Sequence, residues 1–356
     1  MHWSTRLFIY ALPLLFLSCS SGYSLKDPTK VPSPSTGKAQ ALIDQGMAAY
    51  DEGRYQAAID LYRQVLVDEP DNVSALYELA MAYSVVQQHD KSLELCLQAA
   101  QYQWPGLPRV YVLTGTELDY LGKPDDAIAV YEQALRQYPN DLLLHYNLGV
   151  TQLSQHHLDD AKAALKTAAV LRPTHPSSHL ALAHAFLEEG NKIPALFALA
   201  RFLTLEPLSD RANTAREMLK SILFGNVRRD PDKTHQINIT VSPVQPTSEG
   251  DFSSLSLMLA LSSARQVGES QKGKTETDRY TEIFELVFST AGNSAEQQRQ
   301  PQFVWQYYVP YFAELNKRGY VRAFVEHAIV RTTERSDTVT NFLRWSEGYT
   351  WPKTTR

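Results

Sequence analysis

A pattern of small and apolar residues recurs about every 34 residues from Ala39 onward, and this repetition constrains the fold more than any other feature of the chain. Five units follow one another: Ala39–Asn72, Val73–Gly106, a third that begins one residue late at Pro108, Leu142–His175 and Pro176–Ser209. A period of this length is typical of a solenoid, in which each unit has one uncovered face and its neighbours stack on it to complete the core. We therefore predict a stacked array over residues 38–209.

The residues that recur within each unit indicate a pair of helices. Small residues stand where the first helix must approach the second closely, at Gly46, Ala80, Gly115, Gly149 and Ala183, and on the second helix at Ala58, Ala127, Ala161 and Ala195. Glycine accepts the left-handed conformation that often ends a helix, and Gly53, Gly122 and Gly190 fall where the first helix should end. A carboxylate complements a helix N-terminus, and Asp90, Asp125 and Asp159 fall where the second helix should begin.

These units resemble the tetratricopeptide repeat, and the resemblance covers about half of the chain. The second unit departs most from the pattern, because Trp104 stands in place of the terminal proline and Ser92 in place of alanine. The resemblance implies an all-α solenoid of five repeats over residues 38–209. The apolar stripe of residues 210–225 predicts a capping helix after the last repeat. We expect a smaller helical domain to follow.

The same resemblance implies a binding surface, because the first helix of each repeat lines the concave wall of such a solenoid. Its inward positions here are apolar and aromatic, which predicts a groove for a protein or peptide with an apolar or amphipathic segment. Arg109 alone matches the placement of the basic set that clamps a C-terminal carboxylate in chaperone-binding relatives. The alternative is that several of these residues pack on the C-terminal region or on neighbouring turns. The candidate groove residues are Tyr50, Tyr77, Met81, Val85, Arg109, Tyr120, Tyr146, Val150, Leu153 and Leu180.

Residues 1–18 have the features of a leader. Arg6 precedes about eleven mostly apolar residues, a run too short for a membrane-spanning helix of about 20 residues. The junction Ser18-Cys19 resembles a bacterial lipobox, which implies that Cys19 is lipidated and that the protein is anchored at the periplasmic face of the outer membrane. The alternative is an ordinary secretory signal. Residues 19–37 are rich in Ser, Pro, Lys, Thr and Gly and predict a flexible tether.

The C-terminal third does not continue the repeat. Residues 226–250 are polar and predict a linker with one candidate strand at Ile237–Val241, and residues 251–350 show helical periodicity typical of a small bundle. The aromatic cluster from Trp305 to Phe312 fits a buried core, a ligand cage or a membrane-facing patch. We expect it to be core.

Composition and motifs argue against several functions. The formal net charge of −5 provides no basic surface, so we expect no nucleic-acid partner. No Walker, HExxH, GxSxG or paired CxxC motif occurs, and we expect neither a cofactor nor a metal. His179 and His184 share a helix but lie five residues apart, off one face, and Cys96 is predicted to be a buried, inert thiol. We expect a scaffold rather than an enzyme. The alternative is an enzyme, or a glycan or small-ligand binder, that acts through residues 251–350 with the repeats as a targeting arm.

Overall fold

The first ten helices pair as five antiparallel hairpins, which confirms the predicted solenoid. The computed structural model describes residues 25–225, 227–229, 237–240, 247–267, 273–297, 301–331 and 336–352; the leader and Cys19 lie outside these residues. The hairpins are α1 (Gly37–Asp51) with α2 (Tyr55–Asp68), α3 (Val73–Val85) with α4 (His89–Ala99), α5 (Leu107–Tyr120) with α6 (Pro124–Gln137), α7 (Leu142–Ser154) with α8 (Leu158–Leu171), and α9 (Pro176–Glu188) with α10 (Lys192–Leu205).

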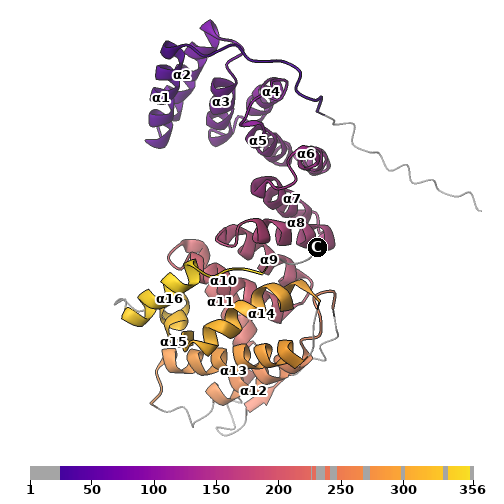
Figure 1. Cartoon of the computed structure of the whole chain (residues 1–356), viewed down its shortest axis with the longest axis vertical. Coiled ribbons are helices and arrows are strands. Elements are labelled where there is room, and N and C mark those ends of the chain that lie inside the picture. Colours follow the sequence, from indigo (N-terminus) through magenta and orange to yellow (C-terminus); the bar gives the residue numbers. More distant parts are fainter. Residues whose placement is uncertain are drawn as a thin grey trace, which may run out of the picture.

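The odd-numbered helices form one wall of the solenoid. Each of them packs on the next odd-numbered helix as well as on its own partner, and Figure 1 shows them along the inner side of the curve. The close approach within a hairpin depends on the predicted small residues. A methyl group added at Gly46 would lie 2.4 Å from the Tyr62 ring, and one added at Gly115 would lie 2.3 Å from the Tyr131 ring. The tyrosine of the second helix therefore lies across the first helix where that helix has no side chain.

The turn inside each hairpin takes the left-handed conformation in all five repeats. Gly53, Gly122 and Gly190 have φ of +76°, +72° and +84°, as the sequence predicts. The equivalent residues of the second and fourth repeats are Gln87 and His156, each with φ of 60°. A residue other than glycine costs about 1 kcal/mol in this conformation. Packing of the repeated hairpin therefore outweighs the backbone preference of Gln87 and His156 at these two turns.

Residues 25–36 are ordered, which corrects part of the predicted flexible tether of residues 19–37. We call this segment the strap. It runs backwards along the solenoid edge formed by the turns between repeats (Figure 1). The backbone amide of Leu25 donates to the side chain of Gln133 on α6, and Lys30 pairs with the backbone of residues 101–103. The backbone amides of Ser33 and Thr36 donate to the carboxylates of Asp71 and Glu69. The repeats therefore supply the hydrogen-bond partners that order the strap, which has too few apolar residues to form a core of its own.

The strap pairs with the irregular end of the second repeat. Seven residues, 100–106, separate α4 from α5, whereas four residues separate α2 from α3 and α6 from α7. The longer connection contains Gln101 and Gln103, whose backbone groups bond the strap at Thr29 and Lys30. The absence of the terminal proline and the one-residue offset of the third repeat therefore accompany a backbone pairing.

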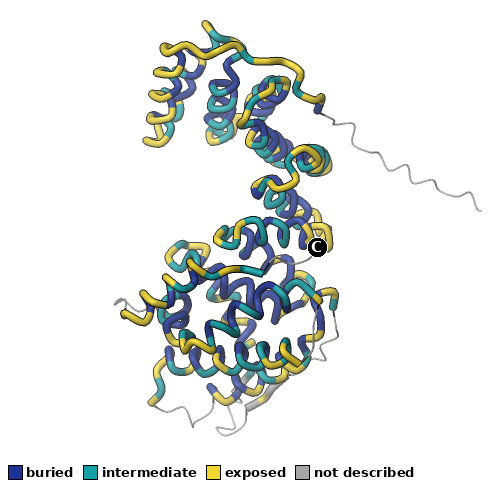
Figure 2. Tube along the Cα trace, in the orientation of Figure 1, coloured by how far each residue is buried: buried dark blue, intermediate teal, exposed yellow. Residues whose placement is uncertain are grey.

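The C-terminal region is helical, as predicted, but it shares one core with the fifth repeat. Its elements are α11 (Asp210–Phe224), β1 (Val227–Arg229), β2 (Ile237–Ile239), α12 (Ser253–Val267), α13 (Glu276–Gln297), α14 (Phe303–Lys317), α15 (Val321–Phe324), the π-helical segment η2 (Val325–Val330) and α16 (Asp337–Glu347). One continuous apolar cluster extends from Leu165 to Phe342, and Figure 2 shows the buried interior of this body. Helix α11 is covered by α12, so the predicted capping helix does not end the core.

Two features of residues 226–250 differ from a simple linker. β1 and β2 pair antiparallel, with Val227 opposite Ile239. Glu249 is fully buried and its carboxylate pairs with Lys166 of α8, while Ser248 bonds Lys162 at 3.2 Å. The end of the predicted linker is therefore attached to the fourth repeat by charged hydrogen bonds.

Candidate functional site: the inner wall of the repeats

The inner wall is the surface formed by α1, α3, α5, α7 and α9. Three of the ten predicted residues are exposed on it: Val85, Arg109 and Tyr120, the last with 68% of its surface accessible. The other seven are half-buried: Tyr50, Tyr77, Met81, Tyr146, Val150, Leu153 and Leu180. Exposed Met47 and Leu143 lie on the same helices and were missed, although they occupy the ninth and second positions of their repeats, two of the inward positions.

Several side chains of the wall are in aromatic pairs. Tyr50 packs edge-on against Tyr55 at 5.3 Å between ring centres, and Tyr77 lies 5.9 Å from Trp104. Tyr120 stacks on His89 at 4.7 Å, and His89 in turn pairs with the fully buried carboxylate of Glu117 at 2.7 Å. Tyrosine and tryptophan offer large contact areas with few rotatable bonds, so this wall presents preformed apolar area to a partner.

The lower end of the wall is less available. Tyr146, Val150 and Leu180 pack against the core that the fourth and fifth repeats share with the C-terminal helices. These contacts agree with the alternative interpretation, in which such residues serve packing; Tyr50, Tyr77 and Met81 likewise rest against the core of the upper repeats. The accessible apolar side chains of the wall lie on α1, α3, α5 and α7.

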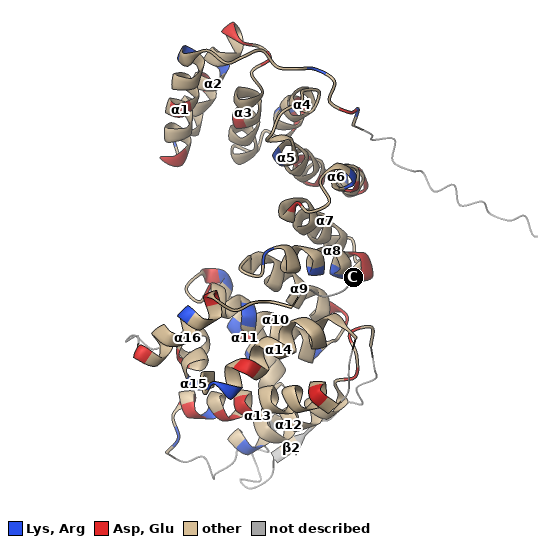
Figure 3. Cartoon of the chain, viewed as in Figure 1, with Lys and Arg blue, Asp and Glu red and all other residues tan. Residues whose placement is uncertain are grey.

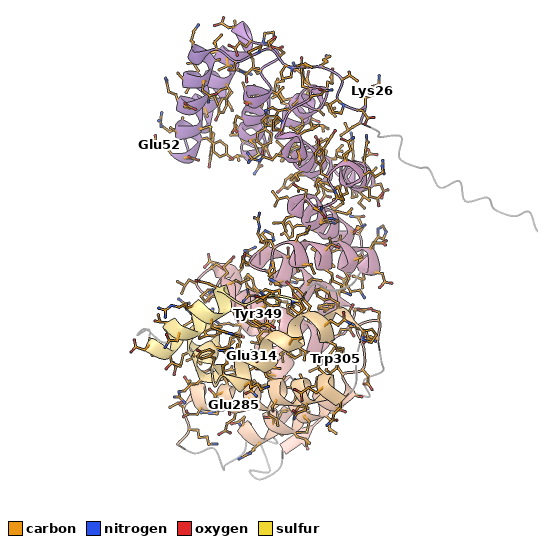
Figure 4. All side chains as sticks on the ribbon, viewed as in Figure 1. Lys26, Glu52, Glu285, Trp305, Glu314 and Tyr349 are labelled. Atoms are coloured by element: carbon orange, nitrogen blue, oxygen red, sulfur yellow. The ribbon has the colours of Figure 1, made fainter. Side chains whose placement is uncertain are left out.

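The upper end of the wall is acidic. Glu78 of α3 is half-buried, and burial raises the pKa of its carboxyl while the nearby Arg109 lowers it and Asp51 raises it. Burial and then Glu78 raise the pKa of Tyr77 to about 12. Figure 3 shows the distribution of charge along the helices, and Figure 4 shows Glu52, which follows Asp51, on the opposite side of the solenoid from Lys26 of the strap.

The aromatic cluster of α14 is core, as expected, and not an open cage. Tyr307, Tyr308, Tyr311 and Phe312 are fully buried, and the Tyr307 hydroxyl donates to the Ala169 carbonyl of α8 at 2.7 Å. α14 runs unbroken through Pro310. Figure 4 shows Trp305 and Tyr349 within the C-terminal body. The cluster therefore attaches the C-terminal helices to the repeats.

His179 is part of the same attachment. It is fully buried, and burial together with the charge of Arg201 lowers its pKa to about 3, so the ring is neutral at ordinary pH. Nε2 lies 3.0 Å from the Pro173 carbonyl, which can only accept, so we assign the proton to Nε2. Nδ1 then accepts from the Tyr308 hydroxyl at 2.7 Å. Both ring nitrogens are occupied, which leaves neither for a metal.

Three other kinds of feature bear on function in the part of the chain that the structure describes: metal sites, reactive thiols and membrane-spanning helices. That part contains no group of three or more His, Cys, Asp or Glu residues arranged to hold a metal ion. Cys96 is buried, as predicted, and burial raises its thiol pKa well above the ordinary value. None of the described helices combines the length and the apolar character needed to cross a membrane.

One open cleft of about 610 Å³ lies between α12 and α13, away from the inner wall. It is lined by Leu261, Ser262, Arg265, Gln266, Glu282, Glu285, Leu286, Ser289 and Asn316. Its lining combines polar and charged side chains with two leucines and has no aromatic side chain.

Comparison with known proteins identifies the repeats. Family models described as "Tetratricopeptide repeat" match residues 43–108 and 121–185. Tetratricopeptide repeat protein 28 of Homo sapiens is 33% identical over 113 residues, which are 31% of this chain and 4% of that protein. The small glutamine-rich tetratricopeptide repeat-containing protein of Dictyostelium discoideum is 32% identical over 105 residues, 29% of this chain and 30% of that one. The chain therefore spans less than a third of either relative.

Solved structures match about half of the chain. A thermophilic TPR protein of Thermus thermophilus has 26% identity and a TM-score of 0.44, and the match covers 52% of this chain and 98% of that one. PilW, described as a widely conserved type IV pilus biogenesis factor, has 20% identity and a TM-score of 0.44 over 53% of this chain and 91% of that one. From the family models and the hairpin geometry together, residues 43–108 and 121–185 are tetratricopeptide repeats.

Proposed function

We propose that this chain is a membrane-anchored scaffold of the bacterial cell envelope, not an enzyme, and that it binds a protein partner on the inner wall of its repeats. The observation that carries the proposal is the set of exposed apolar side chains on four successive inner helices: Met47, Val85, Tyr120 and Leu143. Exposed apolar side chains that share one wall of a solenoid are candidates for an interaction site. Each of the four occupies one of the inward positions of its repeat, so all four belong to the same wall.

The partner is expected to present an apolar or amphipathic segment. Half-buried Tyr77, Met81 and Leu153 flank the exposed side chains with apolar surface that is already in place. A rigid aromatic wall reduces the entropy that association costs, because few of its rotamers remain to be fixed. The segment can be a helix or an extended strand, since both place apolar side chains along one face.

Photo-crosslinking tests the proposed surface. With benzoylphenylalanine at position 85 or 120, we expect one adduct of defined mass in the producing cell, because both side chains are exposed on the inner wall. Positions 67 and 208 are matched controls, because Val67 on α2 and Leu208 before α11 are equally apolar and more exposed but lie outside the wall. Adducts of equal yield from all four positions, or none from positions 85 and 120, would contradict the proposal.

The anchor is tested separately through Cys19. We propose that Cys19 carries the lipid, with the protein at the periplasmic face of the outer membrane, on the basis of the leader and the Ser18-Cys19 junction. Several acyl chains bury many CH₂ groups at about 0.8 kcal/mol each, which makes anchoring stable. Cells fed an alkyne-labelled palmitate should label the natural chain and not Cys19→Ser, and Cys19→Ser should leave the membrane fraction. Equal labelling of both chains would exclude lipidation at Cys19, whatever the crosslinking shows.

A further inference from the structure

Two carboxylates at the upper end of the inner wall have no hydrogen-bond partner among the described residues. Glu78 is half-buried on α3, and Asp51 is exposed at the end of the neighbouring α1. Neither makes a hydrogen bond or an ion pair within the part of the chain that the structure describes, and Arg109 does not pair with either of them. Burial raises the pKa of the Glu78 carboxyl because its charged form has lost part of its hydration, which a cationic partner could replace.

The hydroxyl of Tyr62 is also without a partner. Tyr62 is fully buried, with its ring against Gly46 of α1, and its hydroxyl makes no hydrogen bond. Burial, then Glu78 and Asp51, raise its pKa, so the hydroxyl lies within the field of both carboxylates. It thus provides a second unsatisfied polar group beside the same two acids.

The third repeat shows where such a hydroxyl points. Tyr131 occupies the equivalent position, and its hydroxyl lies 3.3 Å from the Thr116 hydroxyl and 3.5 Å from the Val112 carbonyl. Thr116 and Val112 are inward positions of α5, so the ring reaches through to the inner wall. In the first repeat the position of Thr116 is taken by Met47, which offers no hydroxyl. The Tyr62 hydroxyl is therefore directed toward the inner wall and has lost the internal partner that Tyr131 keeps.

The charge of the inner helices favours a cationic partner. They carry six carboxylates, Asp44, Asp51, Glu78, Glu117, Asp119 and Glu188, against two full cations, Lys38 and Arg109. Lys38 pairs with Asp68 at 2.8 Å. Asp44 accepts from Gln40, and Asp119 accepts from Thr151. Glu117 pairs with His89, and Glu188 pairs with His156. The carboxylates that remain for a partner are Asp51 and Glu78.

We propose that Asp51, Glu78 and the Tyr62 hydroxyl form a subsite for a lysine or arginine side chain of the segment that docks on the inner wall. The inference rests on the proposed function, because it describes one end of the same docked segment. An ammonium or guanidinium group has several donors and can satisfy two carboxylates and one hydroxyl together. The rings of Tyr50 and Tyr77, which also lie within the field of Glu78, supply apolar and cation–π contact. The recognised segment is therefore amphipathic, with a basic residue at the end that meets the first two repeats.

A selection from a random peptide library tests this while the natural partner is still unidentified. The immobilised full chain is offered 16-residue peptides displayed on phage, and enriched peptides are synthesised with their basic residue kept or replaced by norleucine. We expect enriched peptides to combine apolar residues with an excess of Lys or Arg. We expect the norleucine analogue to bind the natural chain about tenfold to a hundredfold more weakly, the range for loss of a charged hydrogen bond.

Variants locate the effect. Glu78→Gln and Asp51→Asn keep the shape and remove the charge, so they should remove most of the preference for the basic peptide over its norleucine analogue. Glu94→Gln, at an exposed acid of α4, is the matched control and should keep it. Tyr62→Phe should leave the thermal stability of the free chain unchanged or higher, because the hydroxyl is unpaired, and still weaken binding of the basic peptide. Tyr131→Phe is the control for that hydroxyl and should leave peptide binding unchanged.

The outcomes separate this inference from the proposed function. Enriched peptides without an excess of basic residues, or equal affinities for Glu78→Gln and the natural chain, would overturn the subsite. In that case binding that still falls in Tyr120→Ala would leave the inner wall as the docking surface. If no peptide is enriched, or if Tyr120→Ala binds every enriched peptide unchanged, the docking surface and the subsite both fail.

Discussion

A chain that ends after Gly225 is expected to lose the stable fold of its fourth and fifth repeats, because the C-terminal helices cover α10. Every residue from Ile193 to Thr204 is buried. Phe197 packs on Phe288 and Phe312 at 6.0 and 5.5 Å between ring centres. Exposing about five such side chains at about 2 kcal/mol each costs about 10 kcal/mol. That loss is comparable with the whole stability of an ordinary domain, about 5–15 kcal/mol. The truncated chain should therefore aggregate or melt far below the full chain in circular dichroism and size-exclusion measurements.

The matched control keeps both parts and cuts only the connection. When residues 1–232 and 233–356 are produced together as two chains, they should elute together because their shared core does not depend on the peptide bond between them. A truncated chain that melts within about 3 °C of the full chain, equivalent to roughly 1 kcal/mol, would show instead that the repeats and the C-terminal helices are independent domains.

Arg201→Ala is expected to lower the free energy of unfolding by about 3–5 kcal/mol, the range for emptying a large buried site. Arg201 of α10 is fully buried. Its guanidinium donates to the Pro173 carbonyl at 3.2 Å and to Ser346 at 3.0 Å. It also lies 5.0 Å from the Tyr311 ring centre and 4.8 Å from that of Trp351. The alanine variant would remove all of these contacts and leave a cavity, which chemical denaturation should detect.

Arg201→Met separates volume from charge. No carboxylate pairs with Arg201 in the part of the chain that the structure describes, so its buried charge carries a desolvation cost that only rings, a carbonyl and hydroxyls offset. Methionine fills much of the same space without that cost and should destabilise by about 1 kcal/mol. Arg136→Ala, on the exposed face of α6, controls for loss of a cation. If methionine proves as damaging as alanine, the cation itself holds Trp351 and Ser346 against the repeats.

The repeats were predictable because several positions of each unit carry the same kind of residue, which fixes where each unit begins. Small residues such as Gly115 and Ala161 fix where helices meet, and Gly122 and Asp125 fix where one helix ends and the next begins. Each of these requirements is local and is met in most of the units, so weaknesses in the second repeat did not obscure the pattern. The inward positions follow from the same phase, which is why Val85 and Tyr120 were found on the inner wall.

The rest depended on contacts between distant parts of the chain. The composition of the strap predicts a tether because it cannot form a core, but the segment is ordered by donors and acceptors such as Gln133 and Asp71, which composition does not reveal. The shared core does have a signal in the sequence: α10 is apolar on every side, which indicates a helix buried all round. The acidic subsite needed the structure, because only the geometry of Tyr131 shows where Tyr62 points.

The strap also limits the distance that can separate the repeats from a lipid bilayer. Eighteen residues of free chain, from Cys19 to Gly37, would reach about 60 Å, but the strap is already bound at Leu25 beside α6. Residues 19–24 can then span at most about 20 Å between a lipid on Cys19 and the bound Leu25. With a lipid on Cys19, the third repeat stays within one protein diameter of the membrane while the first repeat and the C-terminal body extend to either side. If the proposed anchor is present, a partner on the inner wall would then be met close to the lipid surface.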